Sequence, residues 1–437
     1  MATSNSKSRR KLIKSVVCPH CWNEFAPEDA LWISEAPALL GDYKLGETER
    51  VRFLPTEYDA RGAAVDAKGY SCKDLACPRC HLKLPACALD SPALFMSIVG
   101  APASGKSYYL ASSTFMLRSS LASKFRLNFL DGDPEMNAKL SSYETMQFVA
   151  NSSELVKIEK TQEFGGDLYN TVLIGDQSVT FPQPFVFLAA PGAGHPNEGK
   201  EDVASRMICL YDNAGESYLP TKGADLASNP VTRHLAQCKC LFFLYDPTQD
   251  PRFRKACREV SKDPQVYDDS GMRVSTLRQD SVFAETAKRV RAHNNIPSYQ
   301  KFDRPLVVIV SKADVWRRLV PSLDLNVEPV APFKYRDFNV CALRNDVVRH
   351  ASQLTRNMLM KYAPEFISSV ESFASDVVYI PVSATGVSPV VDQNDAEKSG
   401  GFRASEIRPI WIDVPMIYAI SRLTKGLIVT VDKDGKA

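Results

Sequence analysis

The chain lacks any long apolar run, and this absence excludes one class of protein at once. Its 437 residues contain no stretch near the roughly 20 apolar residues that a bilayer-spanning helix needs. Basic residues gather near the N-terminus, but the apolar stretch after them is far too short for a signal peptide. We therefore expect no transmembrane segment, a cytoplasmic location, and a solvated basic tail over residues 1–14. Contact of that tail with nucleic acid or acidic lipid is the functional alternative.

An excess of one charge is also missing. The sequence has 53 Lys and Arg against 51 Asp and Glu, a formal net charge of +2. This balance gives no reason to expect a nucleic-acid or membrane surface. Hydrophobic residues make up 44% and charged residues 24%, which is ordinary for a globular protein. The length alone suggests two or three domains.

Cysteine, in contrast, is abundant. Eleven cysteines are present, an odd number, and four of them form the pairs Cys18–Cys21 and Cys77–Cys80, each with the pattern Cys-Pro-x-Cys. Without an export signal, this favours a reducing compartment and metal binding over disulfides. Four thiolates suit Zn²⁺ in a tetrahedral site. We predict a β-rich, zinc-ribbon-like module over residues 15–90. The gap between the pairs is longer than a ribbon usually has, and Leu31–Ile33 and Val51–Leu54 could supply strands to fill it.

Other readings of this region remain open. A redox role for a Cys-x-x-Cys pair is one alternative. Four nearby side chains could substitute as metal ligands, namely His20, Cys72, His81 and Cys87. We expect these to be bystanders, because four cysteines already close a structural zinc site and leave no open position for catalysis.

The segment Gly100–Ser107 fits the pattern G-x-x-x-x-G-K-[ST] of a phosphate-binding P-loop. An apolar run, Leu94–Val99, precedes it as a buried strand would, and Ser107–Phe125 follows as a helix. Backbone N–H groups of such a loop bind phosphate, the lysine neutralises charge, and the hydroxyl of the last residue holds Mg²⁺. We expect nucleotide contacts from Gly100, Ala103, Ser104, Gly105, Lys106, Ser107 and Tyr108, with Lys106 also catalytic.

Short apolar, β-branched runs recur after this loop and predict a mostly parallel α/β sheet flanked by helices over residues 92–430. The runs are Leu94–Val99, Phe185–Ala190, Met207–Tyr211, Leu241–Tyr245, Leu306–Val310 and Val377–Ile380. Helices are expected at Ser281–Asn294 and at Leu343–Phe373, where Pro364 should break or kink the helix. Long insertions are expected at about 126–183 and 247–303. Within the first, Arg126–Asp133 looks like an extra edge strand.

Polar residues follow several of these strands, at the edge where ligands bind in such sheets. Asp212 follows Met207–Tyr211 and begins the pattern D-x-x-G, which ends at Gly215. An aspartate there is placed to hold Mg²⁺, and the glycine N–H is placed to meet a γ-phosphate. Ser311-Lys312-Ala313-Asp314 and Ser383-Ala384 follow two later strands.

With these four motifs in this order, the chain resembles the GTPases of the P-loop superfamily, a TRAFAC-like, Ras-like class. The resemblance implies that Asp314 accepts hydrogen bonds from the guanine ring and that Lys312 lies along the base. It also implies that the Ala384 N–H meets the guanine oxygen. Ser311 departs from the usual Asn or Thr, which puts strict guanine selectivity in doubt.

Two elements of the GTPase mechanism are harder to place. Glu216 follows the D-x-x-G glycine where many small GTPases have Gln. It could orient or activate the attacking water, or be an ordinary residue in a slow or partner-dependent enzyme. The family also needs a switch threonine on Mg²⁺, for which Thr161 is the first candidate and Thr171 and Thr180 are alternatives.

The cysteine module followed by these GTPase motifs resembles the double-GTPase proteins of bacterial conflict systems. This resemblance implies a nucleotide-timed switch that binds GTP or GDP with Mg²⁺, hydrolyses GTP, and works with a second GTPase or effector. Two alternatives remain: an ATP-hydrolysing P-loop regulator, and a zinc-ribbon nucleic-acid binder with a regulatory nucleotide site. Acidic residues offset the cations in residues 15–90, so nucleic acid is the less favoured partner.

Overall fold

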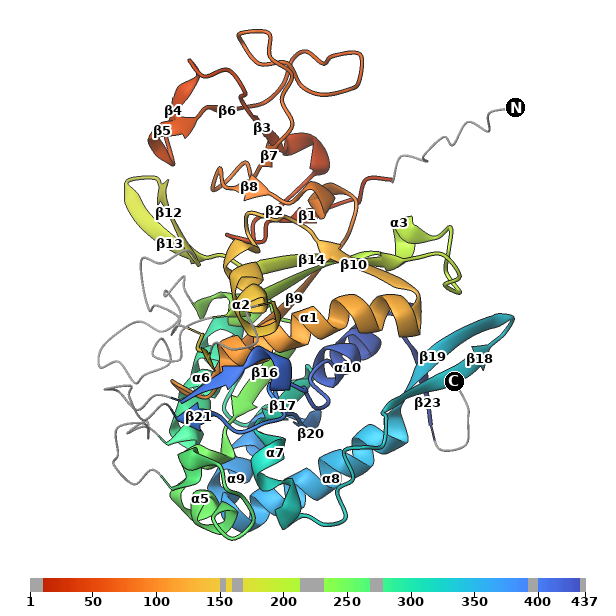
Figure 1. The fold of residues 1–437 in the computed structure, drawn as a ribbon. Coiled ribbons are helices and arrows are strands. Elements are labelled where there is room, and N and C mark those ends of the chain that lie inside the picture. Colours follow the sequence, from red (N-terminus) through yellow and green to blue (C-terminus); the bar gives the residue numbers. More distant parts are fainter. Residues whose placement is uncertain are drawn as a thin grey trace.

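A computed structural model describes residues 11–149, 155–158, 168–212, 232–267, 278–391 and 400–432. It is a mixed α/β structure built around a seven-stranded sheet (Figure 1). In spatial order the strands are β10 (Leu127–Asp131), β14 (Phe185–Pro191), β15 (Arg206–Asp212), β9 (Ala93–Gly100), β16 (Cys240–Tyr245), β17 (Leu306–Val310) and β20 (Val377–Pro381). The predicted strands, including the edge strand after residue 126, are therefore confirmed.

The sheet is mostly parallel. Strands β15, β9, β16, β17 and β20 pair in parallel, whereas β14 is antiparallel to both of its neighbours. The parallel strands are buried on both faces, which explains why the sequence shows continuous apolar runs there instead of alternation. Their carboxyl ends meet at one edge of the sheet, where the polar motifs follow.

Helices and a cysteine-rich module cover the two faces of the sheet. The helices are α1 (Lys106–Phe125), α2 (Ala138–Phe148), α3 (Glu201–Ala204), α4 (His234–Gln237), α5 (Pro251–Cys257), α6 (Gln279–Asn294), α7 (Ala313–Trp316), α8 (Asn345–Tyr362), α9 (Pro364–Phe373) and α10 (Val414–Leu423). Helix α1 covers one face, where Arg118 lies over the Phe187 ring. On the other face Phe243 contacts Phe283 of α6 and Phe366 of α9.

The predicted helix Leu343–Phe373 differs from the structure in one respect. Its break at Pro364 is confirmed, because α8 ends at Tyr362 and α9 begins at Pro364. Its start was wrong: Leu343 belongs to a strand, β19 (Phe338–Arg344), and the helix begins at Asn345. The β-branched and apolar residues just before Asn345 pair with β18 (Val330–Tyr335) and β23 (Val429–Val431), so tertiary pairing decides their structure.

The N-terminal module is made of short strands: β1 (Val16–Val17), β2 (Glu24–Phe25), β3 (Leu31–Ile33), β4 (Leu40–Asp42), β5 (Gly46–Arg50), β6 (Arg52–Phe53), β7 (Leu75–Ala76) and β8 (Lys83–Leu84). The strands expected between the two cysteine pairs are present as β3 and β6. The module lies beside β14 (Figure 1), and its Trp22 contacts Tyr211 of β15. Trp22 shares a buried cluster there with Phe95 of β9 and Met207 of β15.

Smaller sheets complete the described fold. They contain the hairpin β12 (Tyr169–Ile174) with β13 (Gln177–Pro182), and the strands β11 (Leu155–Val156), β21 (Val390–Val391) and β22 (Gly400–Arg403). Leu173 of the hairpin donates its N–H to the Lys44 carbonyl at 2.9 Å, which ties the hairpin to the cysteine-rich module. Among the helices of the described ranges, none has both the length and the apolar character needed to cross a bilayer.

Candidate functional site

The loop between β9 and α1, where the sequence predicts a phosphate-binding turn, has two residues with positive φ. Gly105 has φ +92° and Ala103 has φ +57°, so the chain turns sharply before the helix begins. A Cβ at Gly100 would lie 2.8 Å from the Leu244 carbonyl oxygen, so only glycine fits this close approach of β9 to β16. The first N–H groups of an α-helix are not used by the helix's own ladder of hydrogen bonds, and those of α1 follow directly on this turn. The geometry suits an anion.

Lys106 and Asp212 lie close together beside this loop. Lys106 is buried in the first turn of α1 and donates a hydrogen bond to the Gly100 carbonyl at 3.3 Å. Asp212 ends β15 and pairs with Ile98 of β9. Burial raises the pKa of Asp212 to about 6, and the charge of Lys106 acts in the opposite direction.

The carboxylate of Asp212 is buried and makes no hydrogen bond within the part of the chain that the structure describes. Neither of its two oxygens has a hydrogen-bond partner among the described residues. An unpaired buried carboxylate is costly, and a divalent cation with its waters is the partner that would satisfy it. Ser107, half-buried in the first turn of α1, has the hydroxyl expected for the same Mg²⁺. These residues fit the metal.

At the same edge of the sheet, but after β17, the side chain of Lys312 is held by three oxygen atoms. Its Nζ donates to Asp246 Oδ2 at 2.6 Å, to Thr248 Oγ1 at 2.9 Å and to Gln265 Oε1 at 2.5 Å. The residue has φ +55°, a left-handed backbone conformation. Sequence reasoning missed Asp246, although it follows a buried strand just as Asp212 does. Its position directly after a buried strand was the sequence feature that could have identified Asp246 as a site residue.

Asp314 lies two residues after Lys312, in the first turn of α7. Burial raises the pKa of its carboxyl above the usual value, while a hydrogen bond from Ser383 acts in the opposite direction. Asp263 is a buried acid on the same side, as Asp246 is, and burial raises the pKa of Asp263 as well. A ligand with N–H donors would satisfy such acceptors.

The loop after β20 is fixed to both α1 and the chain near residue 410. Ser383 exchanges backbone hydrogen bonds with Ile410, each at 2.9 Å. The Ala384 carbonyl accepts hydrogen bonds from Ser112 Oγ at 2.7 Å and from Gln147 Nε2 at 3.3 Å. The helix that follows the phosphate loop therefore also positions this loop.

One cavity of about 360 Å³ joins the two sides. Its lining residues from the predicted site are Ala103, Ser104, Gly105, Tyr108, Ser311, Lys312, Asp314, Ser383 and Ala384. Gly100, Lys106, Ser107 and Asp212 are not among the lining residues. Arg254, Asp263 and Gln265 line it without having been predicted as site residues. The cavity has the size of a small-molecule site.

Some predicted residues lie elsewhere or outside the described residues. Thr161, Gly215 and Glu216 fall outside the described ranges. Thr171 and Thr180 face each other on the β12–β13 hairpin, with 3.1 Å between their hydroxyl oxygens. Because that hairpin packs on the cysteine-rich module, neither threonine lines the cavity.

Two arginines of helix α5 lie in different environments. Arg252 lies on the surface, where it contacts Asp250 and Glu365. Arg254, on the same helix α5, lines the cavity. If an arginine of this chain contacts a bound anion, the geometry therefore selects Arg254 over Arg252.

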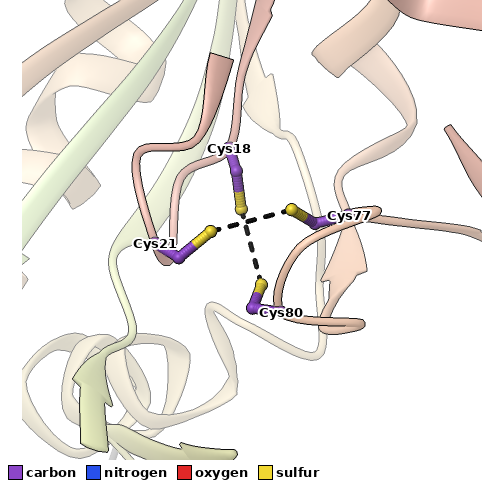
Figure 2. Close-up of side chains that lie close together, drawn as sticks. All are labelled: Cys18, Cys21, Cys77 and Cys80. Atoms are coloured by element: carbon purple, nitrogen blue, oxygen red, sulfur yellow. Dashed lines mark hydrogen bonds between the residues drawn. The ribbon is translucent and has the colours of Figure 1, made fainter. Parts of the chain in front are cut away.

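The four cysteines of the two Cys-Pro-x-Cys turns converge on one point (Figure 2). Their sulfur atoms all lie within 4.8 Å of one another, and all four side chains are buried. The Sγ atoms of Cys18 and Cys80 are 3.8 Å apart, and those of Cys21 and Cys77 are 3.7 Å apart. Four sulfurs about 2.3 Å from a central Zn²⁺ would be separated by about 3.8 Å. The cluster could hold such an ion.

The two turns are built alike, as the repeated sequence pattern suggests. Trp22 and His81, each directly after the second cysteine of a pair, have φ of +56° and +62°. Backbone N–H groups of His20 and Arg79 point to the Cys18 and Cys77 sulfurs, each at 3.4 Å. Within the described residues, the cluster does not include His20, Cys72, His81 or Cys87. His20 contacts the Lys83 carbonyl and His81 contacts Asp42 instead.

Comparison with known proteins adds little to this geometry. No protein-family model matches the chain, and no curated protein matches it. Matching solved structures include a crystal structure of sup35 complexed with GDP, at 12% sequence identity and a TM-score of 0.24. The match covers 74% of this chain but only 44% of that one, so this chain spans less than half of its length. Likeness at that level establishes neither a shared fold nor a shared ligand.

Proposed function

We propose that the protein is a P-loop GTPase, which binds GTP and GDP with Mg²⁺ and hydrolyses GTP. One observation carries the proposal: a single cavity connects the phosphate loop at Gly105 with Asp314 and Ala384, the pair expected to recognise guanine. A nucleoside phosphate needs an anion-binding end and a base-binding end in one pocket, and the lining of this cavity supports that division.

In this proposal, residues at the two ends of the cavity contact different parts of the nucleotide. N–H groups of the loop after Gly100 bind the phosphates, Lys106 neutralises charge, and Ser107 with Asp212 holds Mg²⁺. Bound Mg²⁺ would supply charge neutralisation on the phosphate oxygens. At the other end Asp314 accepts N–H donors that guanine has and adenine lacks. Adenine would leave that carboxylate unpaired, at a cost of about 1–3 kcal/mol.

Fluorescent GDP binding tests both ends of the pocket. Lys106→Ala should weaken GDP binding at least tenfold, because it removes a buried charge beside the phosphates. Asp314→Ala should bring the competing affinities of GDP and ADP close together. Lys124→Ala, at the other end of α1, and Asp337→Ala, in the exposed β18–β19 turn, are the matched controls. Unchanged base preference in Asp314→Ala contradicts the assignment, and preference of the wild type for ATP favours the ATP-hydrolysing alternative.

We also propose that the four-cysteine cluster binds a structural Zn²⁺, because its buried sulfurs have tetrahedral spacing. A switch role with a second GTPase or effector, in a bacterial conflict system, rests on the resemblance of the motifs alone. Its test is a pull-down of such a partner with the protein loaded with GDP or with a non-hydrolysable GTP analogue. Equal capture in both states contradicts the switch.

A further inference from the structure

Tyr211 connects the cysteine cluster to the main sheet. It is the penultimate residue of β15 and is fully buried. Its hydroxyl donates to the Pro19 carbonyl at 2.5 Å and accepts from Trp22 Nε1 at 3.0 Å. Pro19 lies between Cys18 and Cys21, and Trp22 follows them, so both partners belong to the first cysteine turn. The conformation of that turn therefore fixes the Tyr211 hydroxyl.

The ring of Tyr211 is held as firmly as its hydroxyl. It stacks on His234 with 5.0 Å between ring centroids and 20° between ring planes. His234 Nδ1 in turn lies 2.8 Å from Ser97 Oγ on β9, the strand that leads into the phosphate loop. Tyr211 thus contacts the cysteine turn directly, and it contacts β9 both by strand pairing with Ser97 and through His234.

Asp212, the next residue, depends on this anchor. Successive side chains of a strand point to opposite faces, so Tyr211 faces the cysteine-rich module while Asp212 faces the α1 side. Pairing of β14 with β15 ends at Leu210, whereas pairing with β9 continues to Asp212. Beyond Leu210, the strand is therefore held by the sheet on one edge only. The Asp212 carboxylate adds no hydrogen bond of its own among the described residues.

We propose that Tyr211 is a positioning residue, through which the cysteine turn holds Asp212 in place for Mg²⁺ at the phosphate end of the cavity. This inference rests on the proposed nucleotide function. It assigns the cysteine cluster a role in nucleotide binding beyond stabilising its own module.

The test is Tyr211→Phe in the full chain, which removes the hydroxyl and keeps the ring. The Mg²⁺ concentration needed for half-maximal retention of fluorescent GDP should rise at least about fivefold, because the variant loses both hydrogen bonds between Tyr211 and the cysteine turn. GDP affinity in EDTA should stay unchanged, because the phosphate loop is untouched. Zinc content measured by elemental analysis should also match the wild type. Tyr379→Phe is the control: it removes another buried hydroxyl, bonded to Glu371, from β20 of the same sheet.

The outcomes separate the two proposals. Equal Mg²⁺ midpoints in Tyr211→Phe and the wild type overturn the inference and leave the proposed function standing. An equal loss of GDP affinity with and without Mg²⁺ shows a purely structural role and also overturns it. A wild type that does not bind GDP in Mg²⁺ overturns the proposed function and this inference with it. Should Tyr211→Phe fold poorly, Trp22→Phe removes only the hydrogen bond from Trp22 to the Tyr211 hydroxyl and is judged by the same midpoint.

Discussion

Asp212 shows how one residue can be unfavourable for the fold and suited to a ligand. Its carboxylate is buried without a hydrogen-bond partner among the described residues, and burial raises its pKa to about 6. Asp314 on the other side of the cavity has a raised pKa for the same reason. Buried acids with perturbed pKa values gather at functional sites more often than elsewhere.

Asp212→Asn should stabilise the unliganded protein at neutral pH. A carboxyl whose pKa is higher in the folded state stabilises the fold when protonated, and this contribution is lost as pH rises from about 4 through 6. The gain of the variant in unfolding free energy should therefore be near zero at pH 4 and on the order of 1–3 kcal/mol at pH 7.5. Urea unfolding at the two pH values measures it. A gain that does not grow with pH would contradict the environment described for Asp212.

At the scale of elements, the sequence predicts the sheet well and the loops at its edge only in part. The strands were predictable because burial on both faces gives continuous apolar runs in the sequence. The loop before α1 was predictable because its glycines stand at positions where the backbone requires them. Thr248 and Gln265, which hold Lys312 together with Asp246, could not be found from motif spacing. They come from two segments that only the folded chain brings together.

The loop after β20 depends on one glycine. Gly386 has φ +69°, and a Cβ there would lie 1.8 Å from the Arg408 carbonyl oxygen. Gly386→Ala should displace the Ser383–Ala384 loop, destabilise the protein by about 1–3 kcal/mol and weaken GDP binding. Gly175→Ala, in the β12–β13 turn, shares the positive φ (+60°) but has open space around it. Thermal melting and GDP titration are measured on both variants. The Gly175→Ala variant reports backbone strain alone, so a larger loss of stability in Gly386→Ala measures the steric clash. Equal losses in the two variants would contradict the clash.

At the scale of the whole molecule, the cysteine-rich module forms part of the protein's core. Trp22 and the four cysteines share one buried cluster with Phe95, Met207 and Tyr211 of the main sheet. Spacing alone predicted a cysteine cluster, but its packing on β9 and β15 involves contacts between distant parts of the chain that no local pattern reveals.

Replacing Cys18 and Cys77 together by alanine should remove about one zinc ion per chain and destabilise the main sheet as well as the module. The control replaces Cys238 and Cys257, two buried cysteines outside the cluster. Elemental analysis and melting curves, with and without a chelator, measure both effects. Zinc retained by the double variant would show that other residues bind the ion.

The contact between Trp22 and Tyr211 also sets an order of events during synthesis. The two residues are 189 positions apart. At a translation rate of about 5–20 residues per second, the tryptophan leaves the ribosome roughly 10–40 s before its partner exists. During that interval the first cysteine turn has no sheet to pack against, and its apolar side chains are exposed to chaperones and to neighbouring nascent chains. The proposed binding of zinc by the cysteines would be able to begin in this period, but the N-terminal module reaches its final packing only after β15 has been made.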